Sequence, residues 1–260
     1  MRTAQDFAAA GHDEPVRWLY AMAQATEADL GALIVIAEQL PKETIALCEL
    51  ALDLTRSIVD RLRIVAIVGE AAEAAHPLLS AWLSDLGNRL SHVGSREEAL
   101  AASQEAVDIR RRLVQTRPDA FLPDLAMSLN NLGGDLSNLG RREEALAASQ
   151  EAVDIRRRLA QTRPDAFLPD LATSLGAQGQ ALAQAERYAD AAGAFREGLS
   201  VIVPFVERHA EAFGGLADAL RREHVAACEK AGTAPDIVLL ERVARALGGG
   251  DKPMRPRSRP

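Results

Sequence analysis

One 18-residue stretch of sequence, REEALAASQEAVDIRRRL, occurs twice in this chain, from Arg96 to Leu113 and again from Arg142 to Leu159, at an offset of 46 residues. The copies stay alike as far as Leu129 and Leu175, with differences only at Val114/Ala160 and Met127/Thr173. A degraded third copy keeps the spacing, with Ala191 and Gly198 in the places of Ala145 and Ala152. Tandem copies of a short unit predict a stack of supersecondary units, because each copy covers its apolar face only against its neighbours.

Each copy contains two helical patterns. In the first, leucines recur at spacings of four, three, four and three, which places them on one helix face: Leu125, Leu129, Leu132, Leu136 and Leu139. In the second, small and apolar residues lie on one side and charges on the other: Ala145, Leu146, Ser149, Ala152, Val153 and Leu159. Gly140 is suited to end the first helix in a left-handed conformation, and Glu143 and Glu144 suit the start of the second. The pattern predicts an antiparallel helical hairpin.

Proline separates one hairpin from the next in the segments Thr116–Asp119 and Thr162–Asp165, both reading TRPD. Pro164 disfavours helical geometry at Arg163 and can itself open the next helix, so a helix boundary is expected here. Glycine recurs once per copy at Gly87, Gly133 and Gly179, where we expect close approach of the two helices of a hairpin.

These residues resemble the tetratricopeptide repeat. The signature L-x-x-L-G-x-x-L appears as Leu129, Leu132, Gly133 and Leu136, followed by Ala145 and Ala152 at the family's small-residue positions. The unit is 46 residues long instead of roughly 34, and the usual aromatic positions hold Leu136 and Ser149. The long second helices resemble the kinesin-light-chain variety. The sequence of residues 141–172 also resembles repeat arrays of actinobacterial proteins, which often join such repeats to signalling NTPase or caspase-like modules. Neither module is visible in this sequence.

The resemblance implies an all-α fold, a right-handed α-solenoid of antiparallel helix hairpins. We expect the following organisation: an N-terminal helical segment (1–26), a diverged repeat and connector (27–76), three repeats (77–205, divided at about 77–118, 119–164 and 165–205), capping helices (206–247) and a disordered basic tail (248–260).

Composition narrows the function classes. The formal net charge of −7 and a pI near 5.4 argue against a broad surface for nucleic acid or anionic lipid. Cys48 and Cys228 are too few for a disulfide framework and are expected in the core. The longest apolar run, Ala32 to Ala37, is far shorter than the roughly 20 residues of a membrane helix. A cytoplasmic location is the simplest interpretation.

Catalytic and metal-binding chemistry has weak sequence support. No G-x-x-x-x-G-K-[ST] loop is present, and Gly248–Lys252 is only a faint echo of one. His224 and Cys228 could share a helix face, with His209 as a distant third ligand, but a buried Cys beside a half-exposed His is the simpler interpretation. The remaining histidines, His12, His76 and His92, have no partner at a diagnostic spacing. We expect no enzyme activity, no cofactor and no metal.

The expected function is a scaffold that binds a protein or peptide in the concave groove formed by the first helices. Stepping around those helices from the leucine stripe selects nine groove residues: Ser84, Asn88, His92, Met127, Asn130, Asn138, Thr173, Gln180 and Gln184. An alternative surface is a basic ridge for an acidic partner: Arg110, Arg111, Arg112, Arg156, Arg157 and Arg158. An alternative function is a self-associating regulatory or sensor component of a bacterial signalling or defence system whose effector is a separate protein.

Overall fold

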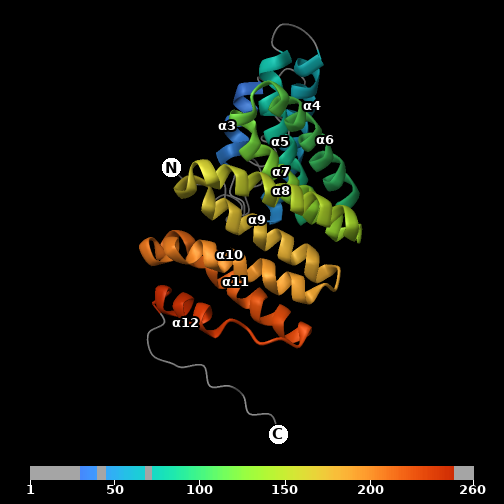
Figure 1. Ribbon diagram of the computed structural model, residues 1–260. Helices are drawn as coiled ribbons and strands as arrows, with labels where there is room; N and C mark the ends of the chain where they lie inside the picture. Colours follow the sequence, from blue (N-terminus) through green and yellow to red (C-terminus); the bar gives the residue numbers. More distant parts are fainter. Residues whose placement is uncertain (1–29, 40–44, 68–71, 249–260) are drawn as a thin grey trace, which may run out of the picture. The chain divides into compact units, whose positions relative to one another are not determined.

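The computed structural model describes residues 30–39, 45–67 and 72–248, and every regular element in these ranges is an α-helix (Figure 1). The expected all-α class is confirmed. Two compact units divide the chain, residues 1–121 and 122–260, and each is considered by itself below. The expected N-terminal segment 1–26, with His12, and residues 249–260 of the expected tail lie outside the described residues.

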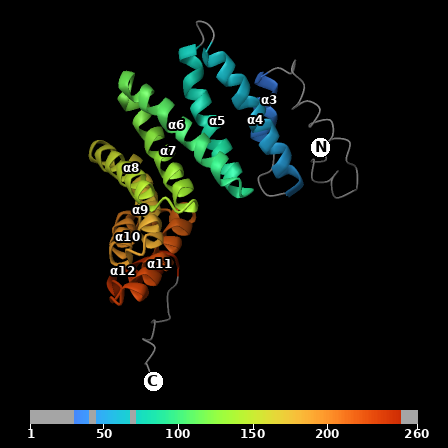
Figure 2. The ribbon, with the colours of Figure 1, turned by 90° about the vertical axis from the view of Figure 1, so that its right-hand side faces the viewer.

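The first unit contains four helices in its described residues: α3 (Leu30–Gln39), α4 (Ile45–Ile67), α5 (Ala72–His92) and α6 (Arg96–Thr116). Helix α4 packs against α3 and α5, and α5 packs against α6 (Figure 2). Leucines of α4 and α5 fill the space between these helices, among them Leu54 and Leu83, both fully buried. Ion pairs from Arg56 to Glu98 and from Arg63 to Glu105 tie α4 to α6.

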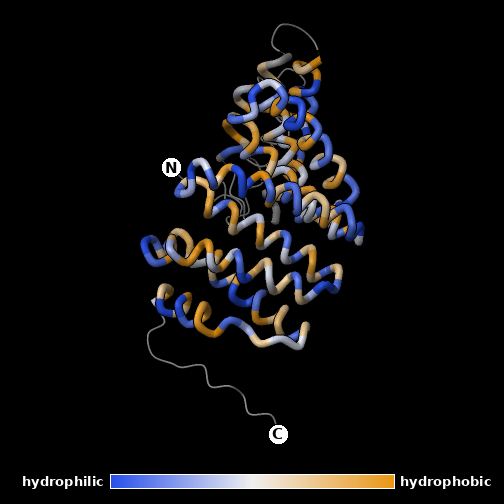
Figure 3. Tube along the Cα trace, in the orientation of Figure 1, coloured by the Kyte–Doolittle hydropathy of each residue, from blue (hydrophilic) through white to orange (hydrophobic). Residues whose placement is uncertain are grey.

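The second unit is entered through α7 (Pro118–Asn138) and continues with α8 (Arg142–Thr162), α9 (Pro164–Gln184), α10 (Tyr188–Arg208), α11 (Ala210–Ala231) and α12 (Ile237–Ala246). From α8 to α11 each helix packs on the next, and α12 closes against α10 and α11. Hydrophobic and hydrophilic turns alternate along these helices (Figure 3). Phe195, Leu199 and Val203 of α10 are among the most deeply buried residues of this core.

The turn inside each hairpin has the geometry expected from Gly140, whose φ is 74°. The N–H of Arg141 donates to the carbonyl oxygen of Leu136 at 2.9 Å, which is the six-residue closure of a Schellman motif. The same bond closes the turn at Gly94, from Ser95 to Leu90. In the third copy, Glu186 takes the place of glycine and keeps the left-handed conformation, with φ 62°.

The boundary between hairpins also follows the prediction. Arg163 has φ −139° and ψ 77°, outside the helical region, and Pro164 is the first residue of α9. Each boundary carries a contact that the sequence pattern did not reveal: the guanidinium of Arg163 lies 4.8 Å from the ring centre of Phe167, and that of Arg117 lies 4.9 Å from that of Phe121. These cation–π contacts fix the first turn of α7 and of α9.

The three repeated glycines lie where helices come close, as expected. A Cβ atom at Gly133 would stand 3.4 Å from the carbonyl oxygen of Ala145, and one at Gly87 would stand 2.8 Å from Oγ of Ser103. At Gly179 the space is filled by the ring of Phe195, whose Cε1 would be 2.5 Å from an added Cβ. The aromatic position of the repeat, serine in the first two copies, thus holds phenylalanine in the third.

A buried arginine connects α8 to α9. The Arg156 side chain is 8% exposed, and its Nη1 lies 2.8 Å from Oδ2 of Asp170. Burial lowers the pKa of this guanidinium, while Asp170 and then Asp124 act in the opposite direction. The third copy replaces the pair with apolar residues, Ile202 and Leu216, which pack into the core. The same space therefore accepts an ion pair or two hydrocarbon side chains.

We predict that Gly179→Ala lowers the free energy of unfolding by about 1–3 kcal/mol, because the buried ring of Phe195 must shift to admit the added methyl group. Gly193→Ala in α10 is the matched control: nothing lies within 4 Å of its added Cβ, so helix propensity should raise stability by up to about 1 kcal/mol. Urea unfolding of both variants measures the difference. Equal effects of the two substitutions would contradict the close contact at Gly179.

We predict that Asp170→Leu costs roughly 1–2 kcal/mol, because it removes the closest carboxylate from a buried cation that Asp124 alone then faces. The double variant Arg156→Ile/Asp170→Leu, which copies Ile202 and Leu216, should recover most of that loss. A double-mutant cycle measured by urea unfolding gives the coupling. Additive losses would show that the two residues act independently.

Candidate functional site

The nine predicted groove residues lie on α5, α7 and α9. Ser84, Asn88 and His92 belong to the first unit, and the other six belong to the second. Asn88 and His92 are exposed. Ser84 is not: it is 6% exposed, and its hydroxyl donates to the carbonyl oxygen of Ser80 at 3.1 Å. Its expected position on an open face is therefore wrong.

In the second unit, four of the predicted residues line one cavity. Asn130 and Asn138 of α7 and Gln180 and Gln184 of α9 border a space of about 270 Å³, here called the α7–α9 groove. Sequence reasoning missed the rest of its lining, which consists of small residues: Gly133, Gly134, Ser137, Ser149, Ala177 and Ala181. Glycine, alanine and serine leave room between two helices, and the amides lie among them. Met127 and Thr173 are exposed but do not line this cavity.

Asn130 has the most informative geometry in the α7–α9 groove. Its Nδ2 donates to Oγ of Ser174 at 2.9 Å, which links α7 to α9. Its Oδ1 is buried and accepts no hydrogen bond. Because a hydroxyl can donate as well as accept, turning the amide would satisfy the oxygen and leave the nitrogen unpaired instead. In either orientation one polar atom of the side chain has no hydrogen-bond partner among the described residues.

The six arginines of the alternative basic ridge do not form one exposed surface. Arg110 and Arg156 are buried, at 2% and 7% exposure, so their expected position at a solvated helix end is wrong. Both stand one residue after a buried isoleucine, on the inner face of their helix. Arg157 is half-buried and binds Glu197 at 2.8 Å. The exposed members are Arg111, Arg112 and Arg158.

The His224–Cys228 pair is internal. His224 is 3% exposed, not half-exposed as the sequence suggested, and Cys228 is 2% exposed, with Sγ 3.8 Å from both ring nitrogens. Nδ1 of His224 lies 3.0 Å from the carbonyl oxygen of Ala192, and the N–H of Asp236 points to Nε2 at 3.4 Å. A neutral imidazole that donates from Nδ1 and accepts at Nε2 satisfies both contacts. His224 thus ties α11 to α10 and to the start of α12.

The described residues contain no group of three or more His, Cys, Asp or Glu side chains arranged to hold a metal ion. Among the helices in the described ranges, none combines the length and the low polarity needed to cross a bilayer. Of the two cysteines, Cys228 is in the core as expected, whereas Cys48 is only partly buried.

Comparison with known proteins identifies the repeat. A sequence model described as the tetratricopeptide repeat matches residues 79–119 and 125–164. Among solved structures, a kinesin light chain from Podosopora anserina with nearly identical TPR-like repeats superposes with a TM-score of 0.60 at 16% identity, covering 84% of this chain and 94% of that one. BtubC (BKLC) from P. vanneervenii gives 0.59 at 17% identity and covers 100% and 98% of the two chains. No curated protein matches in sequence. At these identities the likeness shows the fold, a TPR-like α-solenoid, as the sequence predicted.

We predict that acid weakens the attachment of α12 through His224. Burial holds the pKa of this imidazole below its ordinary value of 6.5, against the hydrogen bond to Ala192 and the charge of Asp236, and Arg196 lowers it further. The unfolded chain then binds the proton more readily, so this contribution to stability is present above pH 6.5 and is lost as the pH falls through the lower folded-state pKa. Once Nε2 is protonated it is a donor, and it can no longer accept the hydrogen bond from the N–H of Asp236.

Hydrogen exchange of the α12 amides between about pH 7 and pH 5, corrected for intrinsic rates, tests this expectation. His224→Gln is the control, because glutamine can donate and accept but does not titrate. Protection of α12 should fall with pH in the natural chain and stay level in the variant. The same pH dependence in both proteins would show that another group is responsible.

Proposed function

We propose that this chain, in which residues 79–119 and 125–164 match the tetratricopeptide repeat and whose fold is like that of kinesin-light-chain repeats, is a non-catalytic scaffold that binds an extended segment of a partner protein in the α7–α9 groove. Repeats of this kind generally mediate protein–protein interaction. The observation that carries the proposal is the buried, unpaired Oδ1 of Asn130 beside this cavity.

An unpaired buried acceptor costs about 1–3 kcal/mol in the free protein, and native structures keep few of them. Once the side chain turns its oxygen toward the cavity, a backbone N–H of a bound peptide would supply the missing donor and remove that cost. An extended segment offers such groups at regular intervals, with side chains alternating to either side. The small residues around Asn130 leave room for the backbone of the bound peptide to approach α7 and α9.

The charge of the groove favours recognition of backbone and shape. Its lining consists of amides, a pair of serines, glycines and alanines, and it contains no residue with a formal charge. Amides both donate and accept, so they can bond to peptide groups in either direction of the chain. We therefore expect binding here to depend little on salt, in contrast to binding at a ridge of arginines. Met127 and Thr173 of the same unit are proposed as further exposed contacts of the partner, and Asn88 and His92 as exposed contacts of the first unit considered by itself.

We also propose a cytoplasmic location, and we expect neither nucleic acid nor anionic lipid as a ligand. Both cysteines are free thiols, which is the usual state in a reducing cytoplasm. The net charge of −7 disfavours nucleic acid and anionic lipid as partners. A protein or peptide partner remains the best supported ligand.

We predict that Asn130→Ala weakens peptide binding by about 1–3 kcal/mol, because it removes the acceptor proposed for the peptide. The variant also loses the hydrogen bond from Nδ2 to Ser174, so its stability should fall by about 0.5–1.5 kcal/mol, and binding is measured where it is fully folded. Peptides would be selected from a random dodecapeptide display library against the full chain, and their affinities measured by calorimetry. Asn131→Ala is the matched control, since the neighbouring asparagine does not line the groove.

Two results would overturn the proposed site. One is a selected set in which no peptide depends on Asn130. The other is unchanged affinity in Asn130→Ala together with lost affinity in Arg111→Ala/Arg112→Ala, which would move the binding surface to the exposed arginines. Urea unfolding of every variant separates lost binding from lost folding.

A further inference from the structure

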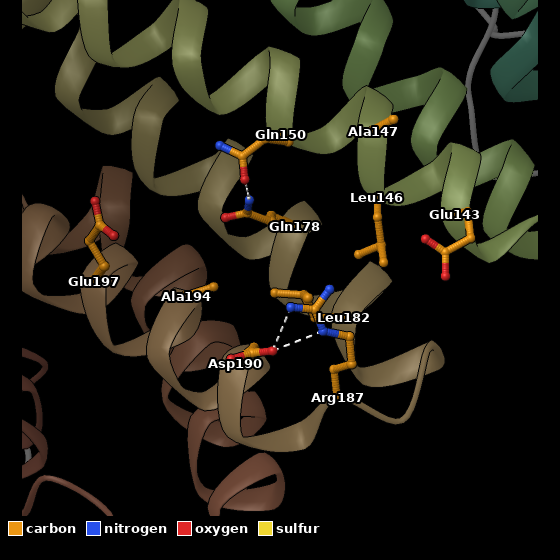
Figure 4. A pocket seen from close by; sticks show the side chains of 10 residues that line it. All are labelled: Glu143, Leu146, Ala147, Gln150, Gln178, Leu182, Arg187, Asp190, Ala194 and Glu197. Atoms are coloured by element: carbon orange, nitrogen blue, oxygen red, sulfur yellow. Dashed lines mark hydrogen bonds and ion pairs between the residues drawn. The ribbon is translucent and has the colours of Figure 1, made fainter.

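A second cavity lies in the same unit, between α8 and α10, and is here called the α8–α10 pocket (Figure 4). Its volume is about 520 Å³. Apolar side chains form one part of the lining, namely Leu146, Ala147, Leu182 and Ala194, and polar side chains form the rest, namely Glu143, Gln150, Gln178, Arg187, Asp190 and Glu197. Hydrocarbon surface beside carboxylates and amides suits a ligand that is itself partly apolar and partly charged.

The α8–α10 pocket is distinct from the α7–α9 groove. Gln178 and Leu182 are its contributions from α9, whereas the groove takes Ala177, Ala181 and the neighbouring glutamines from the same helix. At about 100° per residue, these two sets face directions roughly 120° apart around α9. A ligand in one cavity therefore leaves the other open, and the inference below does not rest on the proposed function.

The hydrogen bonds of two glutamines fix an acceptor in the α8–α10 pocket. Nε2 of Gln150 donates to Oδ1 of Asp154 at 3.0 Å, and an ionised carboxylate can only accept. Oε1 of Gln150 is then the atom that accepts from Nε2 of Gln178, at 2.6 Å (Figure 4). Oε1 of Gln178 is therefore not used in this series of hydrogen bonds, and this oxygen can accept a hydrogen bond from a ligand.

The carboxylates of the α8–α10 pocket differ in how they are engaged. Asp190 binds Nε of Arg187 at 2.8 Å, as the dashed lines in Figure 4 show, and Glu197 binds Arg157 at 2.8 Å. Glu143 is exposed and has no ion pair or hydrogen bond from its side chain to the described residues. It leaves one uncompensated negative charge at the edge of the pocket, next to Leu146.

The polar character of the α8–α10 pocket arises where the third copy departs from the duplicated pair. Gln178 occupies the repeat position of Leu132, which is 5% exposed in α7, and Asp190 occupies that of Glu144, one methylene longer. The residues that α8 contributes are the duplicated ones and recur unchanged in α6. The two departures bring an amide and a shorter carboxylate into this cavity.

We propose that the α8–α10 pocket binds the cationic side chain of a lysine or arginine in a basic segment of a partner protein. The aliphatic stem lies on Leu146, Ala147 and Leu182, because long basic side chains bury their methylenes along apolar surface. The charged head donates to the carboxylate of Glu143, and the backbone N–H of the bound lysine or arginine donates to Oε1 of Gln178 at the other end of the pocket (Figure 4). A carboxylate is the acceptor that a guanidinium or ammonium group prefers, and an amide oxygen accepts from a peptide N–H.

The direct test titrates N-acetyl-arginine amide and N-acetyl-lysine amide into the full ¹⁵N-labelled chain while the side-chain amides of Gln150 and Gln178 are followed by NMR. N-acetyl-norleucine amide, which has the stem without the charge, is the control ligand. We expect saturable shifts with a dissociation constant on the order of millimolar for at least one cationic amide, which corresponds to about −4 kcal/mol. Comparing the two cations distinguishes guanidinium from ammonium recognition. Absence of saturation by both, or equal shifts with norleucine, would overturn the proposal.

Substitutions locate the binding. Glu143→Gln should raise the dissociation constant about 3- to 10-fold, whereas Glu97→Gln, the same change at the same repeat position in α6, should leave it unchanged. Gln178→Leu, which restores the residue of the preceding copy, should abolish the shift at Gln150 while the melting temperature stays level or rises. Equal weakening by Glu143→Gln and Glu97→Gln would show a diffuse charge effect, and undiminished binding to Gln178→Leu would place the ligand elsewhere. Either result would overturn the site.

Discussion

The close contact between the two helices of a hairpin is the constraint on which the rest of the structure depends. At Gly133 an added Cβ would already be in van der Waals contact with the carbonyl oxygen of Ala145, and at Gly179 it would overlap the ring of Phe195. A side chain larger than a methyl group at Gly133, or any side chain at Gly179, would push the helices apart. Leucines from neighbouring helices meet within the core because this distance is short. For the same reason the amides of α7 and α9 border one narrow cavity.

The sequence predicted the local features well, since they depend on only a few neighbouring residues. A glycine after a leucine stripe ends a helix, and an Arg–Pro step starts the next one, wherever the chain lies in space. It placed Asn130, Asn138, Gln180 and Gln184 on the side of α7 and α9 where they border one cavity, because the direction of a side chain around a helix follows from its period. That these amides bind a partner stays a prediction. It failed for Ser84, Arg110 and Arg156, whose burial depends on how deeply a neighbouring helix covers the edge of the apolar face. The helical pattern predicts that an arginine at such an edge is exposed to solvent. Only the packing of the neighbouring helix shows that it is buried.

The third copy shows how the repeat tolerates change. Phe195 fills the site of a serine, Ile202 and Leu216 replace an ion pair, and Gln178 replaces a core leucine. The first two changes exchange polar groups for apolar ones while the register of the repeat is kept, and the larger ring of Phe195 lies against Gly179. The change at Gln178 runs the other way and introduces a polar group near the surface. A single copy has therefore become more apolar at its centre and more polar at one exposed cavity.

The turn at Glu186 has a consequence for how this copy responds to its surroundings. Glycine holds a left-handed backbone at no steric cost, whereas another residue in that conformation costs about 1 kcal/mol. Glu186 lies 3.4 Å from Nη2 of Arg142 at the start of α8, so part of the strain is offset by an ion pair between exposed groups. Ions in solution weaken such a pair but do not affect the glycine turns. The conformation of the loop between α9 and α10 is therefore expected to depend on ionic strength, through one side chain that the loops at Gly94 and Gly140 do not have.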